Sequence, residues 1–241
     1  MSGRNPRVEL VPWDFDSEEH RARMHLQRLA CGWRSEEVQK WAEQGRAATK
    51  TLYWIVVRDD LADGEKLIAK HESTPIADTA PTHWHQPREA APGRAFTPIG
   101  HIALDVRPSQ DRQLGLTSDG EDENGSGIAW VASLYISWAL QRHGLGREVM
   151  AGAEDLAANG PLRARWLVLD TMSREQQMEP ALVRRVYLAQ GNPAPVVPIQ
   201  DWYEAQGYEA FAQEVGGYKW VNPETGERHD IDYVFLRKRL K

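Results

Sequence analysis

The segment from residue 128 to residue 160 constrains the fold more than any other part of this 241-residue chain. Ile128–Ile136 is a nearly continuous apolar run, which is typical of a strand buried on both faces. A turn follows, with the sequence Gln141-Arg142-His143-Gly144-Leu145-Gly146-Arg147. From Gly144 to about residue 158 the apolar residues recur at helical spacing, and Gly160 ends the predicted helix. A strand, a turn and an amphipathic helix in this order predict a mixed α/β domain.

The turn has the features of an anion-binding site. Gly144 and Gly146 allow a tight turn and a close approach of a ligand to the backbone. The first turn of a helix leaves N–H groups unpaired, and the helix dipole adds positive charge there. Arg142, His143 and Arg147 supply further donors at the same end. The sequence therefore favours a phosphate-bearing ligand over a purely structural turn.

Two common phosphate-binding motifs do not fit this turn. The Gly-Lys-Ser/Thr of a Walker loop is missing, and Val149 stands where a dinucleotide fingerprint needs its third glycine. The formal net charge of −6 argues against a nucleic-acid partner, because phosphate neutralisation needs a basic face. A local basic pocket remains compatible with that charge.

Composition limits the remaining classes. The single cysteine, Cys31, excludes an internal disulfide framework and a cysteine-based zinc cluster. His83 and His85 have no evident third ligand, so an exposed loop is favoured over a metal site and no metal is expected. No run approaches the ~18 apolar residues of a membrane span. The first residues contain no apolar signal-peptide core, so we expect a cytoplasmic protein without a membrane partner.

The remaining pattern predicts one domain over residues 1–241. Helices are expected over about 17–31, with Met24, Leu26, Leu29 and Ala30 on an uneven apolar side, and from Ser35 onward. Further helices are expected at 175–190 and 202–206. Strands are expected at 51–57, 67–69, 99–106, 128–136, 166–169, 208–211 and 231–236. Residues 1–6 are expected to be a flexible lead, and 71–97, 107–127 and 174–198 to be insertions.

Three segments in the correct order resemble the GNAT superfamily of acyl-CoA-dependent N-acyltransferases. Gln141-x-x-Gly144-x-Gly146 matches its Gln/Arg-x-x-Gly-x-Gly/Ala motif. Leu134-Tyr135-Ile136 stands where that family has its splayed fourth strand, and Trp202–Tyr208 resembles its aromatic-Tyr-x-x-x-Gly-aromatic segment. The resemblance covers about residues 99–211. It implies a GNAT-like α/β fold: a central, mostly antiparallel sheet with a splayed fourth strand and helices on both faces.

The resemblance also implies a site for acetyl-CoA as co-substrate. The diphosphate would lie on backbone N–H groups from Arg142 to Arg147, and the pantetheine arm would pair like an extra strand with Leu134–Ile136. An N–H near Leu134 or Tyr135 would stabilise the oxyanion formed from the thioester carbonyl. The cofactor-binding residues implied are Leu134, Tyr135, Ile136, Gln141, Arg142, His143, Gly144, Leu145, Gly146 and Arg147.

Catalytic residues are less defined. Tyr203 matches the family's general acid, although its ring could instead simply pack on the sheet. No acidic residue lies in 128–137, where some relatives carry a glutamate. Asp170, at the end of a predicted strand, is the first candidate base, although it could instead cap the turn that follows. Asp105 and His101, on one face of the strand at 99–106, are the others.

The function implied is transfer of an acetyl group from acetyl-CoA to a primary amine by direct attack. The expected acceptor is a small molecule such as an amino acid, a polyamine or a xenobiotic, in a pocket covered by the insertions 71–97 and 107–127. A protein N-terminal or lysine acetyltransferase, a CoA-binding regulatory module and a generic nucleotide binder are the alternatives. The oligomeric expectation is a monomer or a homodimer.

Overall fold

The structure is a computed structural model. It describes residues 6–58, 61, 64–69, 71, 73–84, 86–117, 127–222 and 225–241. Four expectations therefore lie wholly or partly outside the described residues: most of the lead 1–6, His85, and parts of the insertions 71–97 and 107–127.

The chain forms two compact units. Unit 1 contains residues 1–106 and 131–163, and unit 2 contains residues 107–130 and 164–241. The expectation of one domain over 1–241 stays a prediction.

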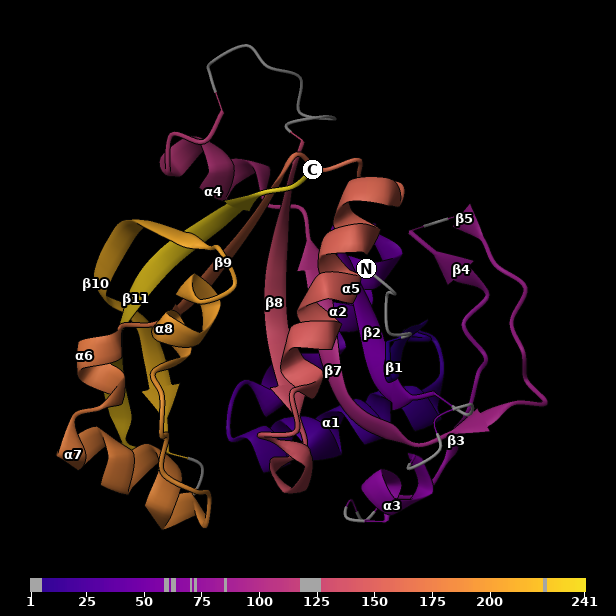
Figure 1. Ribbon diagram of the computed structural model, residues 1–241, viewed down its shortest axis with the longest axis horizontal. Helices are drawn as coiled ribbons and strands as arrows, with labels where there is room; N and C mark the ends of the chain where they lie inside the picture. The colour runs from indigo at the N-terminus through magenta and orange to yellow at the C-terminus, as the bar shows by residue number, and fades with distance from the viewer. Residues whose placement is uncertain are drawn as a thin grey trace. The chain divides into compact units, whose positions relative to one another are not determined.

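Unit 1 is built on four neighbouring strands in the order β1-β2-β7-β8 (Figure 1). Their bounds are β1 Val8–Pro12, β2 Lys50–Val57, β7 Pro98–Asp105 and β8 Ile128–Ile136. The first three residues of β8 belong to unit 2. β1 pairs antiparallel with β2, and β2 antiparallel with β7. The helices are α1 Glu18–Cys31, α2 Val38–Arg46, α3 Gly64–Ile68 and α5 Leu145–Asn159. Short strands occupy the 71–97 insertion: β3 Ile76–Ala77, β4 Thr82–His83, β5 Gln86–Pro87 and β6 Ala95–Phe96.

Helices cover both faces of these strands. α5 packs on β1 and β7, and α2 packs on β2; Figure 1 shows α5 in front of the strands and α2 behind them. The core on the α1–α2 side is built around Trp13, Met24, Trp41 and Trp54. Burial on both faces explains why β2 is apolar along most of its length rather than alternating.

Several local predictions in unit 1 are confirmed. The strands at 51–57, 99–106 and 128–136 and the helix from Gly144 agree with the structure to within about a residue. The strand expected at 67–69 is wrong, because this segment belongs to α3 and the turn after it. β1 has no counterpart among the predicted elements.

The predicted apolar side of α1 is also wrong. Leu26 and Leu29 are 60% and 51% exposed, whereas His20, Met24, Gln27 and Arg28 are buried. The buried polar groups have hydrogen-bond partners: His20 Nε2 lies 2.9 Å from the Ala77 carbonyl oxygen, and Gln27 Nε2 donates to the Pro98 carbonyl oxygen at 2.7 Å. Buried polar groups need hydrogen-bond partners, and these partners allow the polar side of α1 to lie inside the protein.

Unit 2 contains the start of β8 and then, in order across the sheet, β9 Trp166–Met172, β11 Arg228–Arg239 and β10 Glu209–Val221. Its α-helices are α4 Pro108–Gln113, α6 Arg174–Gln177, α7 Pro180–Leu182 and α8 Ile199–Glu204. β9 pairs antiparallel with β11, and β11 with β10. The core includes Ile128, Trp130, Val168 and Phe235. With the antiparallel pairs of both units and helices between strands, the mixed α/β fold class is confirmed.

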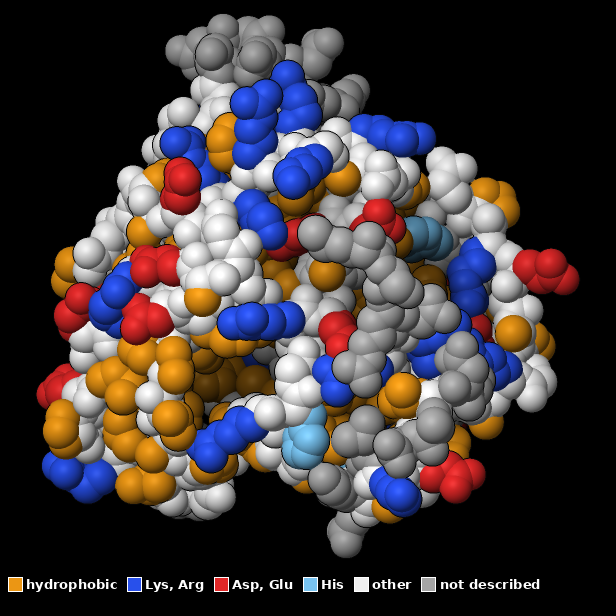
Figure 2. All heavy atoms as spheres, in the orientation of Figure 1, with side chains coloured by type: hydrophobic (Ala, Val, Ile, Leu, Met, Phe, Trp, Pro, Cys, Tyr) orange, Lys and Arg blue, Asp and Glu red, His pale blue; other side chains and the backbone are white. Residues whose placement is uncertain are grey.

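Two expectations in unit 2 need correction. The helix expected at 175–190 is divided into α6, α7, a π-helical turn and a 3-10 turn, because Pro180 cannot continue a helix begun before it. Figure 2 shows apolar side chains gathered on the surface over α7.

The second correction concerns the strand β9. It continues to Met172, so Asp170 lies within this strand and not after it.

Among the described residues, no helix is both long and apolar enough to cross a membrane.

Candidate functional site

β8 is irregular where the pantetheine arm is expected. Ser133 has a φ of 53°, a left-handed conformation that interrupts regular strand geometry. On the neighbouring β7, a Cβ at Gly100 would lie 2.1 Å from the Tyr135 carbonyl oxygen. Glycine at position 100 therefore permits a close approach of β7 to the backbone of Tyr135 and Ile136 in the second half of β8.

The turn between β8 and α5 is held by its own side chains. The Gln141 amide donates to the Ile136 carbonyl oxygen at 3.1 Å, which ties the turn to the end of β8. Arg142 and Gly144 have φ values of 67° and 79°. Gly144 is the N-cap residue of α5 and supplies no side-chain cap. Arg142, His143 and Gly144 are exposed, and among the described residues the N-cap position of α5 supplies no side-chain acceptor for the first N–H groups of the helix.

Arg7, which the sequence analysis did not identify, supports this turn. Its Nη2 donates to the His143 carbonyl oxygen at 2.9 Å and lies 2.6 Å from a Glu148 carboxylate oxygen. A Cβ at position 144 would lie 3.2 Å from the same Nη2. The guanidinium of Arg7, which directly precedes β1, thus packs against the turn. Glycine at position 144 is favoured both by its left-handed backbone and by this close packing. No sequence pattern points to Arg7, because it lies 136 residues from His143.

His101 is fully buried on β7. Its Nδ1 lies 2.7 Å from Gln27 Oε1, and its Nε2 lies 3.3 Å from Arg28 Nη1. Since a guanidinium only donates, the hydrogen-bond network places the ring proton on Nδ1. Burial, and then the Arg28 charge, hold the pKa of His101 well below its ordinary value, so the ring is neutral.

Asp105, at the end of β7, is held in a buried ion pair. Its carboxylate oxygen lies 2.5 Å from Lys50 Nζ, and Lys50 Nζ lies 5.5 Å from the centre of the Trp41 ring. A base must be able to take up a proton and release it. The pairing with Lys50 gives Asp105 a structural role that the sequence did not indicate.

Tyr203 and Asp170 both belong to unit 2. Tyr203 is buried on α8, and burial first, then the negative charge of Asp170, raise its pKa above the ordinary value. Asp170 accepts a hydrogen bond from Arg107 Nη1 at 3.0 Å. The Arg107 guanidinium also lies 4.7 Å from the centre of the Trp130 ring. The structure thus brings two predicted catalytic residues together, with Arg107 as a neighbour that the sequence analysis missed.

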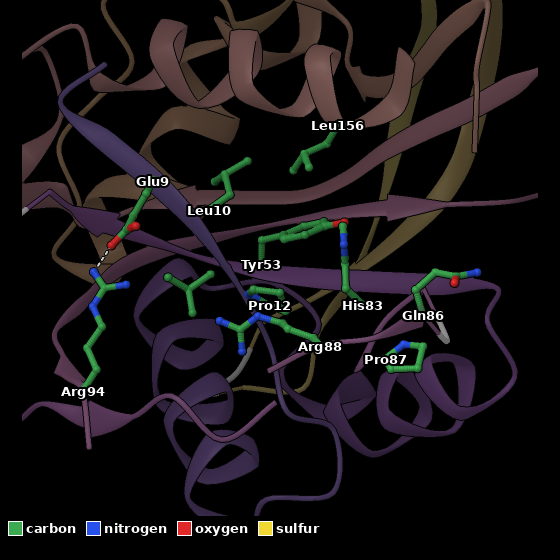
Figure 3. Close-up of a pocket in the computed structure, with 11 residues that line it drawn as sticks. Glu9, Leu10, Pro12, Tyr53, His83, Gln86, Pro87, Arg88, Arg94 and Leu156 are labelled. Carbon is green, nitrogen blue, oxygen red and sulfur yellow. Dashed lines mark hydrogen bonds and ion pairs between the residues drawn. The ribbon is translucent and has the colours of Figure 1, made fainter. Parts of the chain in front are cut away.

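Unit 1 also contains a cavity of about 400 Å³ between β1, β2, the β4–β5 hairpin and α5 (Figure 3). In it the Tyr53 hydroxyl lies 2.6 Å from His83 Nε2. None of the predicted site residues lines this cavity. Within the described ranges, no group of three histidine, cysteine, aspartate or glutamate side chains could hold a metal ion.

Comparison with known proteins shows the fold. No protein-family model and no curated protein match the sequence. Among solved structures, the chain is similar to one described as a GNAT-family acetyltransferase from Desulfovibrio desulfuricans, with a TM-score of 0.53, 12% identity, and coverage of 97% of this chain and 99% of that one. It is also similar to Arabidopsis thaliana NAA60 in complex with acetyl-CoA (TM-score 0.52, 12% identity, coverage 97% and 98%).

A third similar structure is the spermidine N-acetyltransferase from Vibrio cholerae in complex with CoA and spermine. Its TM-score is 0.51 at 8% identity, with coverage of 97% of this chain and 96% of that one. The chain therefore has the fold of the GNAT acetyltransferases, as the resemblance of its motifs implied.

Proposed function

We propose that this protein is an N-acetyltransferase that transfers an acetyl group from acetyl-CoA to a primary amine of a small molecule by direct attack. One observation carries the proposal: the N-cap residue of α5 is Gly144, which supplies no side-chain cap, and the turn that contains it follows the irregular strand β8. Uncapped N–H groups at a helix start bind phosphate groups well. The likeness of the fold to solved GNAT acetyltransferases supports acetyl transfer as the reaction.

In this proposal the backbone N–H groups from Arg142 to Arg147 bind the diphosphate of acetyl-CoA. The fit is supported by Gly144, where any side chain would occupy space beside Arg7 Nη2. Leu134, Tyr135 and Ile136 pair with the pantetheine arm, and an N–H near Leu134 stabilises the developing oxyanion. Gln141, His143 and Gly146 shape the turn, and Leu145, which is buried, anchors the first turn of α5.

The chemistry needs a proton acceptor for the amine and a proton donor for the thiolate. The amine nitrogen bonds to the thioester carbonyl carbon, which gives the oxyanion, and the carbon–sulfur bond breaks when this intermediate collapses. The amine loses its proton to the base, and we assign the proton donated to the departing sulfur to Tyr203. Burial first, and then Asp170, raise the pKa of Tyr203, so its hydroxyl carries a proton at neutral pH, as a proton donor must. For the base we retain Asp170, which is partly exposed, over the buried Asp105 and His101.

The nature of the acceptor is a further part of the proposal. Similar structures include one titled as a spermidine N-acetyltransferase and one titled NAA60, so the fold alone does not choose between a polyamine and other amines. We propose a small-molecule acceptor because the long insertions favour a covered pocket. A cytoplasmic location and a monomeric or homodimeric state stay predictions.

The Tyr203→Phe variant tests the proposal. With acetyl-CoA and a panel of amines, release of free CoA thiol should fall in kcat by about 10²- to 10⁴-fold. The affinity for acetyl-CoA should stay within about twofold, because the phenol is assigned to proton transfer and not to cofactor binding.

Tyr208→Phe is the matched control, because Tyr208 is also buried and its ring centre lies 5.7 Å from that of Tyr203. Its kcat should stay near that of the wild type. An unchanged kcat in Tyr203→Phe would remove Tyr203 from the mechanism. Binding of acetyl-CoA without turnover of any amine would favour a CoA-binding module instead.

A further inference from the structure

Arg28 is a buried cation near the end of α1. The residue is 4% exposed. Nε donates to the Trp33 carbonyl oxygen at 2.7 Å, and Nη1 donates to His101 Nε2 at 3.3 Å. The guanidinium carbon lies 5.3 Å from the centre of the Trp41 ring. All of these partners are neutral.

No carboxylate balances this charge within the described part of the chain. Arg28 has no ion pair there. The acidic residues around Trp41 are engaged elsewhere: Asp105 pairs with Lys50, and Glu37 accepts a hydrogen bond from Trp41 Nε1 at 3.1 Å. A buried charge is costly unless it is paired, so an arginine with only neutral partners indicates a place for an anion.

The Arg28 guanidinium also has N–H donors that make no hydrogen bond to a described residue. It has five N–H groups, and its two hydrogen bonds to described residues use one on Nε and one on Nη1. Arg28 Nη2 has no hydrogen bond to a described residue, and it is not among the fully buried side-chain atoms without a partner. A planar pair of N–H donors matches a carboxylate in two parallel hydrogen bonds.

Arg28 lies beside the segment where the thioester is expected. The charge of Arg28 acts on Tyr135, and the His101 ring, which Arg28 contacts, lies 5.6 Å from the Tyr135 ring. The end of α1 is also tied to the turn after β8, because the Trp138 indole N–H donates to the Ala30 carbonyl oxygen at 2.9 Å. The other groups around Arg28 are the Cys31 thiol, the Tyr135 phenol and the neutral His101.

We propose that the acceptor carries a carboxylate as well as its primary amine, and that Arg28 binds this carboxylate. The proposal rests on the acetyltransferase function and narrows the acceptor to amino-acid-like molecules. A polyamine fits poorly, because it would bring further positive charge to an unbalanced arginine. An acetylated amino acid is then the product.

The first test compares amino acids with their carboxamides as acceptors. In the wild type, kcat/KM should favour the free acid over the amide. Arg28→Gln should reduce this preference by about 10- to 150-fold, the range of a charge-assisted hydrogen bond. Arg28→Lys should retain part of it, since the charge stays but the planar pair of donors is lost.

Arg21→Gln is the matched control on the same helix, where the guanidinium donates to the Phe15 carbonyl oxygen. It should leave the acid-to-amide ratio and the acetyl-CoA affinity unchanged. A purely structural Arg28 would lower stability in Arg28→Gln without altering this ratio. Equal use of acid and amide by the wild type would overturn the inference while leaving the acetyltransferase proposal intact.

The second test needs neither turnover nor a variant. N-acetylglycine should raise the melting temperature of the wild type more than N-acetylglycinamide does, at equal ionic strength, because a ligand of the folded state stabilises it. Equal shifts would contradict carboxylate recognition. Failure to bind acetyl-CoA would refute the proposed function separately, and the N-acetylglycine shift would still decide the carboxylate site.

Discussion

The buried polar residues carry the most information at the scale of single side chains. In unit 1, His20, Gln27, Arg28 and His101 form hydrogen bonds among themselves or with nearby backbone where an apolar core would be the simpler solution. Such networks are costly when partly satisfied and specific when fully satisfied. They therefore make measurable predictions about stability.

Stability should fall as the pH is lowered from 7.5 to 5.5, with a contribution from His101. Its pKa is depressed in the folded state by burial and Arg28, so the unfolded chain binds more protons below about pH 6.5. The stabilisation is complete above that pH. It is lost at up to about 1.4 kcal/mol per pH unit as the pH falls toward the folded pKa.

Urea midpoints at pH 7.5, 6.5 and 5.5 measure this dependence. His101→Gln should show a smaller loss of stability with falling pH than the wild type. His25→Gln is the control, because His25 is exposed on α1, and its pH dependence should match the wild type. An unchanged dependence in His101→Gln would show that the pKa of His101 is the same in the folded and the unfolded chain, and would contradict the depressed pKa.

Asp105→Asn should destabilise the fold by about 3–5 kcal/mol, because it removes the carboxylate from a buried ion pair with Lys50. Chemical denaturation measures the loss. The kcat of the folded fraction should stay near the wild-type value. A stable variant with a large loss of kcat would instead identify Asp105 as the base.

Residues in short motifs could be predicted from the sequence, whereas pairs of residues from distant segments could not. The glycines of the turn and Tyr203 lie in short motifs and can be identified from the sequence. The pairing of Lys50 with Asp105 joins residues 55 positions apart, and that of Arg107 with Asp170 joins residues 63 apart. No local pattern specifies such pairs, so the buried role of Asp105 and the neighbours of Asp170 needed the folded chain.

At the scale of elements, local periodicity succeeded where one face of an element is apolar. β2, β8 and α5 follow their hydrophobic patterns. α1 does not, because hydrogen bonds to the backbone and to His101 stabilise its polar face inside the protein. The boundary of β9 was underestimated for a different reason: its polar residues Asp170 and Thr171 pair with β11 and continue the strand.

Gly144→Ala tests the start of α5 as an element. The substitution forces a side chain into a left-handed backbone and against Arg7, so we expect a loss of about 1–2 kcal/mol in stability. We also expect at least about tenfold weaker binding of acetyl-CoA, since displaced N–H groups lose charge-assisted hydrogen bonds. Calorimetric titration and urea denaturation measure the two effects.

Gly191→Ala is the matched control. Its φ is 71°, and an added Cβ would meet nothing within 4 Å. It should cost a similar strain while leaving the acetyl-CoA affinity unchanged. Equal weakening of acetyl-CoA binding by both variants would mean that the effect comes from general destabilisation.

At the scale of the whole molecule, the GNAT fold and the motif residues agree although sequence identity to the similar structures is 12% or lower. The fold class was predictable because three motifs stand in the correct order along the chain. The acceptor was not, because no motif marks the buried residues that come together from distant segments, such as Arg28 and His101.

The most direct measurement is calorimetric titration of the protein with acetyl-CoA and, separately, with S-acetylpantetheine, which lacks the diphosphate. The turn at Gly144 should bind acetyl-CoA saturably, with a dissociation constant in the range of about 1 μM to 1 mM. S-acetylpantetheine should bind at least about tenfold more weakly, because it forms no charge-assisted hydrogen bonds with the N-terminus of α5. Absence of acetyl-CoA binding, or equal affinity for the two compounds, would contradict the account.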